Sequence, residues 1–290
     1  MTEKDIGVSP NAYSAQRENL SPREALVERW KNAPNKIRKY PTGKITGSSG
    51  ETLYEYSQGA RLLMGDETKE EVIEVMDSCD TPWAFATVDM AFKELGAKDR
   101  PVKVLERGFG MGITARRVIQ NLVAHGGEYT VIELNEENAA YARQWRTSQE
   151  YSLTRMTHGS QDSRPNISIE VLDGEATEVT GMLQKAERKF DIIISDTFPL
   201  SEEERGMNDL LDLDILKHCL ESGGVFTFFA YYPESNGGIK ELQMSAIRKH
   251  FSEYREDEVE VNPPPDYTYL QSSKGPIRKL PVAVCKNPKI

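Results

Sequence analysis

From residue 102 onward, short apolar runs rich in β-branched residues alternate with longer amphipathic stretches, and this alternation constrains the fold more than any other feature. The apolar runs predict strands at Val102–Glu106, Tyr129–Leu134, Ile167–Leu172, Phe190–Ser195 and Val225–Ala230. The amphipathic stretches predict helices at 112–124, 136–147, 177–187, 205–220 and 236–250. Two late runs, Glu258–Val261 and Leu280–Cys285, predict an antiparallel hairpin at one edge. The chain is therefore expected to form an α/β, Rossmann-like domain, with a mostly parallel, seven-stranded sheet and helices on both faces.

The first hundred residues lack this alternation. Residues 1–100 are expected to form an N-terminal extension and helical cap over the ligand crevice of a core at 101–290. Residues 41–50 are predicted to be a loop, because glycine, serine and proline dominate them. Residues 67–95 are predicted to be helical, with a kink at Thr81, since the residue before a proline avoids the helical region.

A helix start is predicted within this cap. Ser21 and Glu24 have the spacing of a capping box, and Pro22 suits the first helical position. The helix is expected to continue to about Asn32.

Charge and cysteine content argue against several classes of protein. The chain has 46 acidic and 36 basic residues and a net charge of −10, which disfavours nucleic acid as a partner. Cys79, Cys219 and Cys285 form no CxxC pair, and the four histidines have no zinc-ligand spacing, so no metal is expected. No apolar run approaches the about 18 residues of a membrane span, and the N-terminus lacks an apolar signal core. These features predict no membrane association and a cytoplasmic location.

A glycine-rich turn follows the first predicted strand. It consists of Gly108, Phe109, Gly110, Met111 and Gly112. In an open parallel sheet, ligands bind beyond the carboxyl ends of the strands, and glycine lets the backbone approach a ligand closely. The GxGxG spacing differs from the GxGxxG of dinucleotide-binding loops. The turn is interpreted as one wall of a nucleoside site, although a tight turn without a ligand has the same pattern.

The next two strand ends extend this interpretation. Glu133 ends the second strand, where a carboxylate can accept both hydroxyl groups of a ribose, and Leu134 and Asn135 follow within reach. Glu175 and Ala176 follow the third strand, at the edge where an adenine would lie. The sequence therefore predicts a nucleoside cofactor along these strand ends.

The fourth strand ends in Asp196, at the centre of the predicted sheet edge. A carboxylate there can orient a cationic hydrogen-bond donor and take its proton. The alternative is an aspartate that only caps a turn.

Several segments together resemble guanidinoacetate N-methyltransferase and its arginine-methylating relatives, over about residues 60–285. The resemblance rests on Val104–Ile113, Glu133–Asn135, Ser195–Glu203, Met76–Trp83, Gly223–Thr227 and Pro263–Tyr267. It implies a class I methyltransferase that binds S-adenosylmethionine through Gly108–Gly112, Glu133–Asn135, Glu175, Ala176 and Asp196.

The resemblance also implies a pair of catalytic carboxylates that hold a guanidino group. One is Asp196, and the other is Asp80, where the family has glutamate. Substrate contacts are implied at Met76 and at Tyr231 and Tyr232, which stand where the family has leucine and threonine. A guanidinium has five N–H donors in a planar fork, which two carboxylates can bind. The expected partner is a small guanidino substrate, with free L-arginine favoured and guanidinoacetate as the alternative; a homodimer is compatible with the sequence.

Rival functions fit less well. An NAD-dependent oxidoreductase would have glycine where Ile113 stands. The Asn-Pro-Pro-Pro run at 262–265 resembles a motif of nucleic-acid amino-methyltransferases but lies far past the fourth strand. The glutamates at 202–204 are adjacent, not spaced on a hairpin as in protein-arginine methyltransferases. A cofactor-binding but inactive interaction protein remains a further alternative, and the presence of Asp196 argues against it.

Overall fold

A seven-stranded sheet forms the centre of the molecule, as predicted. The computed structural model describes residues 20–40, 43–46, 52–56, 59–66, 71–156, 166–201, 204, 206–230, 237–263, 271–272 and 275–289. The sheet contains β6 (Val102–Arg107), β7 (Gly127–Glu133), β8 (Ile167–Asp173), β9 (Phe190–Ser195), β10 (Leu220–Phe228), β11 (Phe251–Glu260) and β14 (Lys279–Pro288). Its order is β11-β14-β10-β9-β6-β7-β8, with β14 antiparallel to β10 and β11 and the other pairs parallel.

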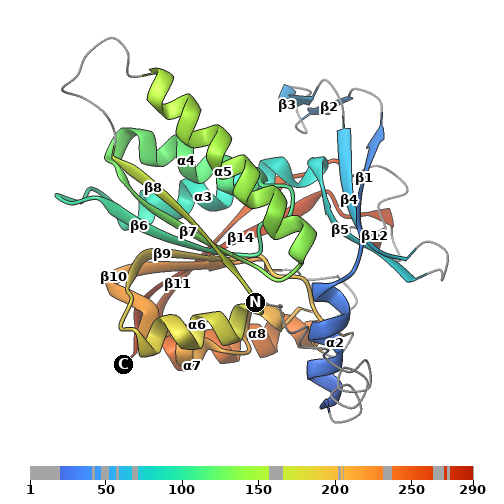
Figure 1. Cartoon of the computed structure of the whole chain (residues 1–290). Coiled ribbons are helices and arrows are strands. Elements are labelled where there is room, and N and C mark those ends of the chain that lie inside the picture. Colours follow the sequence, from blue (N-terminus) through green and yellow to red (C-terminus); the bar gives the residue numbers. More distant parts are fainter. Residues whose placement is uncertain are drawn as a thin grey trace, which may run out of the picture.

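Helices cover both faces of this sheet (Figure 1). On one face lie α3 (Thr81–Leu95), α4 (Ile113–His125) and α5 (Glu136–Met156), and on the other lie α6 (Ala176–Lys185), α7 (Leu213–Leu216) and α8 (Gly237–His250). Side chains alternate between the faces along each strand. Val104 thus joins the core beneath α4, whereas its neighbour Leu105 joins the core beneath α6 and α7.

The chain reverses its direction of winding between β6 and β9. From β6 it proceeds through β7 to β8, and it then returns to place β9 on the other side of β6. Ligands bind beyond the carboxyl ends of strands at such a switch point. The glycine turn after β6 and Asp196 after β9 both lie there.

The N-terminal part differs from the predicted helical cap. The helix α2 (Pro22–Lys31) is present with its capping box. It precedes a three-stranded antiparallel sheet of β1 (Asn35–Tyr40), β4 (Gly59–Asp66) and β5 (Glu71–Asp77). A separate hairpin pairs β2 (Gly43–Thr46) with β3 (Thr52–Tyr56).

Two predictions for this region are therefore wrong in part. Residues 71–77 are strand β5, and the helix begins only at Thr81, after the 3-10 turn η2 (Ser78–Asp80). The β-branched residues of Glu71–Asp77 favour a strand once β4 is available as a partner. The predicted loop at 41–50 contains strand β2, and its other residues lie outside the described part of the chain. The boundary at residue 100 stays a prediction.

In the core, the helix predicted at 205–220 is also wrong. That segment forms the 3-10 turns η4 (Asn208–Leu210) and η5 (Lys217–Cys219), with only α7 between them. The side chains of Asp209 and Asp212 bind partners on the sheet, which competes with a regular helix. The last hairpin also begins earlier than predicted, since β11 starts at Phe251. No helix within the described residues is long and apolar enough to cross a membrane.

Candidate active site

A cavity opens at the carboxyl ends of β6, β7, β8 and β9, with α2 and the N-terminal sheet on its other side. Its wall includes many residues that the sequence predicted: Met76, Asp80, Gly108, Gly110, Glu133, Leu134, Asn135, Glu175, Ala176 and Asp196. The cavity thus brings together residues that the sequence separates by more than a hundred positions.

The glycine turn approaches the neighbouring elements too closely for larger residues. Gly108 has φ of 89°, and a Cβ atom there would lie 2.4 Å from the carbonyl oxygen of Asp196. Gly110 has φ of 52°, and its Cβ would lie 2.9 Å from the Met76 side chain. Side chains at these positions would both strain the backbone and collide with Asp196 and Met76.

The other residues of the turn face away from the cavity wall. Phe109 is fully buried and packs edge-on against Trp145, with 5.5 Å between the ring centroids. Met111 donates its N–H to the Met76 sulfur at 3.4 Å, and Gly112 precedes α4 as its N-cap. These three residues therefore stabilise the conformation of the turn without lining the cavity.

Glu133 is fixed by hydrogen bonds at the end of β7. Its carboxylate accepts the N–H of Phe109 at 3.1 Å, the N–H of Asn135 at 2.9 Å and Nδ2 of Asn138 at 2.8 Å. Burial raises the pKa of Glu133, and these hydrogen bonds act in the opposite direction. A carboxylate has about four acceptor positions, so the group is held in place with capacity left for a ligand.

The Asn135 side chain forms hydrogen bonds with the N-terminal segment. Its Nδ2 donates to the carbonyl oxygens of Trp30 at 3.0 Å and Ala33 at 2.7 Å, and its Oδ1 accepts from Asn35 at 2.6 Å. Asn135 therefore connects the end of α2 to the strand end that carries Glu133.

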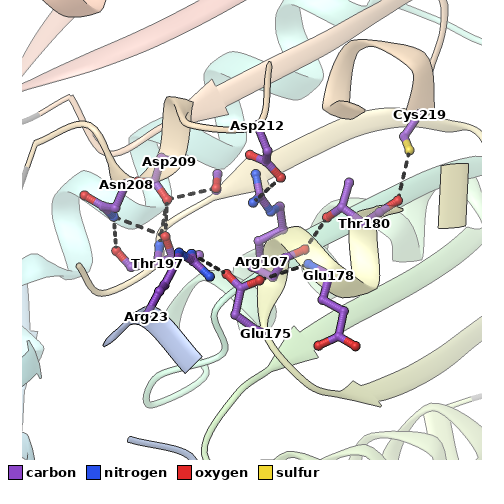
Figure 2. Close-up of polar contacts among 12 residues, drawn as sticks. Arg23, Arg107, Glu175, Glu178, Thr180, Thr197, Asn208, Asp209, Asp212 and Cys219 are labelled. Carbon is purple, nitrogen blue, oxygen red and sulfur yellow. Dashed lines mark hydrogen bonds and ion pairs between the residues drawn. The ribbon is translucent and has the colours of Figure 1, made fainter. Parts of the chain in front are cut away.

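Glu175 forms the far wall, where it meets α2. Its Oε2 caps α6 by accepting the N–H of Glu178 at 2.9 Å, and its Oε1 pairs with Arg23 at 3.2 Å (Figure 2). Burial acts to raise the pKa of Glu175, but the cap hydrogen bonds and Arg23 outweigh it and lower that pKa. Arg23 also pairs with Glu204 at 3.3 Å. The sequence analysis missed Arg23, since nothing in its neighbours distinguishes it from a solvated helix residue.

Asp80 and Asp196 enter the cavity from different parts of the molecule. Asp80 ends η2 and is 9% exposed, and its Oδ2 accepts the N–H of Asp77 at 3.0 Å. Asp77 in turn pairs with buried Arg61 of β4, with 2.9 Å between Nε and Oδ2. Asp196 follows β9 and donates its N–H to the carbonyl oxygen of Arg107 at 3.0 Å.

The two acids share one electrostatic environment. Enclosure raises the pKa of Asp196 well above its ordinary value, and the charges of Asp209 and Asp80 raise it further. The two carboxyl groups are thus near enough to repel each other across the cavity wall. A bound cation between them would relieve that repulsion.

Apolar side chains form a further part of the cavity wall. Met64, Val75 and Met76 line the cavity from the N-terminal sheet, and Trp83 and Phe229 line it from the core. Trp83 also donates Nε1 to the carbonyl oxygen of Pro281 at 3.0 Å, which anchors α3 to β14.

A buried polar network lies beneath the Asp196 loop, and the sequence analysis missed it. Asp209 binds Ser195 and Thr197, and Arg107 pairs with Asp212 at 2.8 Å (Figure 2). Its members fall in the segment that was predicted to be a plain helix.

Some predicted positions are not described. Tyr231 and Tyr232 lie outside the described residues, as do the prolines and tyrosine of 264–267 and the glutamates at 202–203. Within the described part of the chain, no group of three or more histidine, cysteine or acidic side chains is arranged to hold a metal ion.

The family comparison covers most of the chain. The family model of guanidinoacetate N-methyltransferase matches residues 65–261, a range that includes both carboxylates and the glycine turn. No curated protein sequence matches the chain.

Solved structures with a similar fold are distant in sequence. Spermidine synthase from Thermotoga maritima is 17% identical, covers 86% of this chain and 72% of its own, and has a TM-score of 0.47. A probable spermidine synthase from Corynebacterium glutamicum is 13% identical, covers 87% and 79%, and has a TM-score of 0.49. Human methyltransferase-like protein 13 in complex with SAH is 15% identical, covers 71% and 80%, and has a TM-score of 0.42.

Proposed function

Because this chain belongs to the guanidinoacetate N-methyltransferase family, we propose that it transfers the methyl group of S-adenosylmethionine to a terminal guanidino nitrogen of free L-arginine. The chain is an S-adenosylmethionine-dependent N-methyltransferase of the Rossmann-like class. The observation that carries the proposal is the presence of Asp80 and Asp196 on the wall of the same cavity as Glu133 and the glycine turn.

The residues at one end of the cavity fit the cofactor. Gly108 and Gly110 form part of the cavity wall with backbone alone, and the Glu133 carboxylate is assigned to accept ribose hydroxyl groups. Glu175 and Ala176 are assigned to the adenine side. Bound S-adenosylmethionine supplies a sulfonium methyl group, which is already activated toward nucleophiles.

The residues at the other end fit a guanidinium ion. Asp80 and Asp196 present acceptors to its planar fork of donors, and its positive charge offsets their mutual repulsion. A guanidinium nitrogen is a poor nucleophile because its lone pair is delocalised. Asp196 is therefore assigned as the base that takes a proton from the reacting nitrogen.

Methyl transfer breaks one bond, forms one bond and releases one proton. With S-adenosylmethionine bound, the reacting nitrogen would form a bond to the methyl carbon as the carbon–sulfur bond breaks, and the bonding pair would remain on sulfur as part of a neutral thioether. The displaced proton goes to the Asp196 carboxylate, and the products are an N-methylguanidinium ion and S-adenosylhomocysteine. Holding the nitrogen in line with the methyl group contributes much of the rate enhancement.

Two departures from the family pattern favour arginine over guanidinoacetate as the proposed substrate. Asp80 is one methylene shorter than the family's glutamate, so the clamp has more room. Tyr231 and Tyr232 supply hydroxyl groups where the family has leucine and threonine, and these suit the α-amino and α-carboxylate groups of an amino acid.

The substrate assignment is tested by comparing kcat/KM for arginine and guanidinoacetate with purified protein. We expect arginine to be preferred. A preference for guanidinoacetate by tenfold or more, about 1.4 kcal/mol in transition-state binding, would overturn the arginine assignment and leave guanidino methylation intact.

We also propose the cytoplasm as the place where the protein acts. Cys79, Cys219 and Cys285 are buried free thiols, which is compatible with a reducing compartment.

A further inference from the structure

The loop that carries Asp196 is held from beneath by an acid that the proposed function does not use. Asp209, in the 3-10 turn η4, is only 3% exposed. Its Oδ1 accepts three hydrogen bonds: from Ser195 Oγ at 2.9 Å, from the Thr197 N–H at 2.9 Å and from Thr197 Oγ1 at 2.6 Å. Three donors from two residues converge on one oxygen (Figure 2).

We propose that Asp209 is the positioning residue for Asp196, fixing the residues on both sides of it and placing a second negative charge beneath it. The inference rests on the proposed function, in which Asp196 takes the proton. It assigns a role to a residue that touches neither substrate nor cofactor.

The geometry supports the positioning role. Ser195 precedes Asp196 and Thr197 follows it, so one carboxylate restrains both neighbours. The Asp196 N–H is bound to the carbonyl oxygen of Arg107, and Asn208 Nδ2 donates to Thr197 Oγ1 at 3.1 Å. The backbone is therefore restrained on every side of Asp196, while its carboxyl group remains on the cavity wall.

The two acids differ in what surrounds their oxygens. Burial raises the pKa of Asp209 above its ordinary value, although the hydrogen bonds from Thr197 and Ser195 and the nearby charge of Arg107 act in the opposite direction. Within the described residues, the Asp196 carboxyl group accepts no hydrogen bond, and its pKa is raised by enclosure and by its acidic neighbours. Three converging donors favour the ionised form of Asp209 over that of Asp196, so Asp196 is assigned as the member of the pair that exchanges a proton.

The acidic groups near Asp196 come from three elements. Asp80 approaches from η2, Asp209 from η4, and buried Glu106 from β6, where its pKa responds to the charge of Asp196. Arg107 of β6 is the positive member. It pairs with Asp212 at 2.8 Å, and its Nε and Nη1 find no hydrogen-bond partner within the described residues. The charge of Arg107 therefore acts on Asp209 through space.

Substitution of Asp209 by asparagine separates the effect of its charge from the effect of its hydrogen bonds. Asp209→Asn keeps an oxygen that can accept from Thr197 and Ser195 but removes the negative charge. We expect the pH at which Asp196 titrates to move down by about one pH unit, since a nearby like charge has this order of effect. The acid limb of the kcat profile should move with it.

The matched control is Asp214→Asn, which makes the same change on an α7 side chain that is 69% exposed. It should leave the acid limb in place. Asp209→Ala removes charge and acceptor together, so kcat should fall by roughly a hundredfold, the scale of a small misplacement of a reacting group, with cofactor affinity unchanged.

The titration of Asp196 is measured by ¹³C NMR of protein that carries labelled aspartate. The Asp196 resonance is identified because it is missing from the spectrum of Asp196→Asn. The inference is overturned if the wild-type protein methylates guanidino compounds but the pH at which Asp196 titrates is unchanged in Asp209→Asn. If the resonance moves but the wild-type protein methylates no guanidino compound, the proposed function fails and the coupling of the two acids stands.

Discussion

The two ends of the cavity are built in different ways. At the end proposed for the cofactor (the cofactor end), Glu133 receives its hydrogen bonds from Phe109, Asn135 and Asn138, all of which lie on the loops and helix next to its own strand. At the end proposed for the substrate (the reacting end), Asp80 is anchored through Asp77 to the N-terminal sheet, while Asp196 belongs to the core. The Glu133 carboxylate is held in place by its hydrogen bonds, whereas the charges of Asp80 and Asp209 raise the pKa of Asp196.

This difference has a functional consequence. A site whose polar groups are already held in place binds its ligand with little rearrangement. A site with opposed carboxylates favours cationic ligands, because a positive charge between the carboxylates reduces their repulsion. Changes at the reacting end should therefore affect turnover, and changes at the cofactor end should affect binding.

The largest effect is expected from Asp196→Asn. The amide keeps the size of the side chain but cannot take a proton, so kcat should fall by about 10²- to 10⁴-fold, with little change in cofactor affinity. Steady-state kinetics and calorimetry check the two quantities. A loss of less than about tenfold would remove Asp196 from the chemical step.

Asp80 is expected to have the next largest effect. Asp80→Ala should lower kcat/KM for arginine by about 10- to 100-fold, since hydrogen bonds to charged groups contribute about 1.5–3 kcal/mol. Asp80→Glu restores the family's residue and should shift the preference toward guanidinoacetate. Equal loss for both substrates in Asp80→Glu would show that the length of this side chain does not set specificity.

At the cofactor end, Glu133→Ala should weaken S-adenosylmethionine binding by about 1–3 kcal/mol, as buried polar groups lose their partner. The kcat at saturating cofactor should change little. Glu128→Ala, an exposed position on the same strand, is the control. Unchanged affinity on calorimetry would exclude Glu133 from the cofactor site.

The smallest effect concerns stability without ligands. The pKa of Asp196 is raised in the folded state, so the folded protein binds its proton more tightly than the unfolded chain does. Ionised Asp196 therefore destabilises the fold, and stability falls as pH rises from the ordinary aspartate pKa to the raised value. Asp196→Asn should raise the Tm by a few degrees at neutral pH and have little effect at pH values below the ordinary aspartate pKa. A lowered Tm at neutral pH would contradict the repulsion.

The positions of some cavity residues follow from the strand pattern, for a physical reason. Gly108, Gly110 and Glu133 lie where their strands end, so strand periodicity predicts that they share one edge of the sheet. The pairing of Asp80 with Asp196 came from a family resemblance, because no local pattern relates the two positions.

The remaining parts depended on tertiary contacts that no local pattern shows. The run Glu71–Asp77 becomes a strand only because β4 lies beside it. Asp209 and Asp212 break the predicted helix because Ser195, Thr197 and Arg107 offer them partners from β6 and the β9 end. Asn135 follows the predicted strand end, yet its side chain binds the end of α2.

The most direct test of guanidino methylation uses S-adenosylmethionine with an isotopically labelled methyl group. The purified protein is incubated with arginine, and the product is fragmented by mass spectrometry to locate the label. The account predicts the label on a terminal guanidino nitrogen of arginine in the wild-type protein, and its near-complete loss in Asp196→Asn. Label on the α-amino group, or S-adenosylhomocysteine formed without any labelled guanidino compound across arginine and guanidinoacetate, would contradict it.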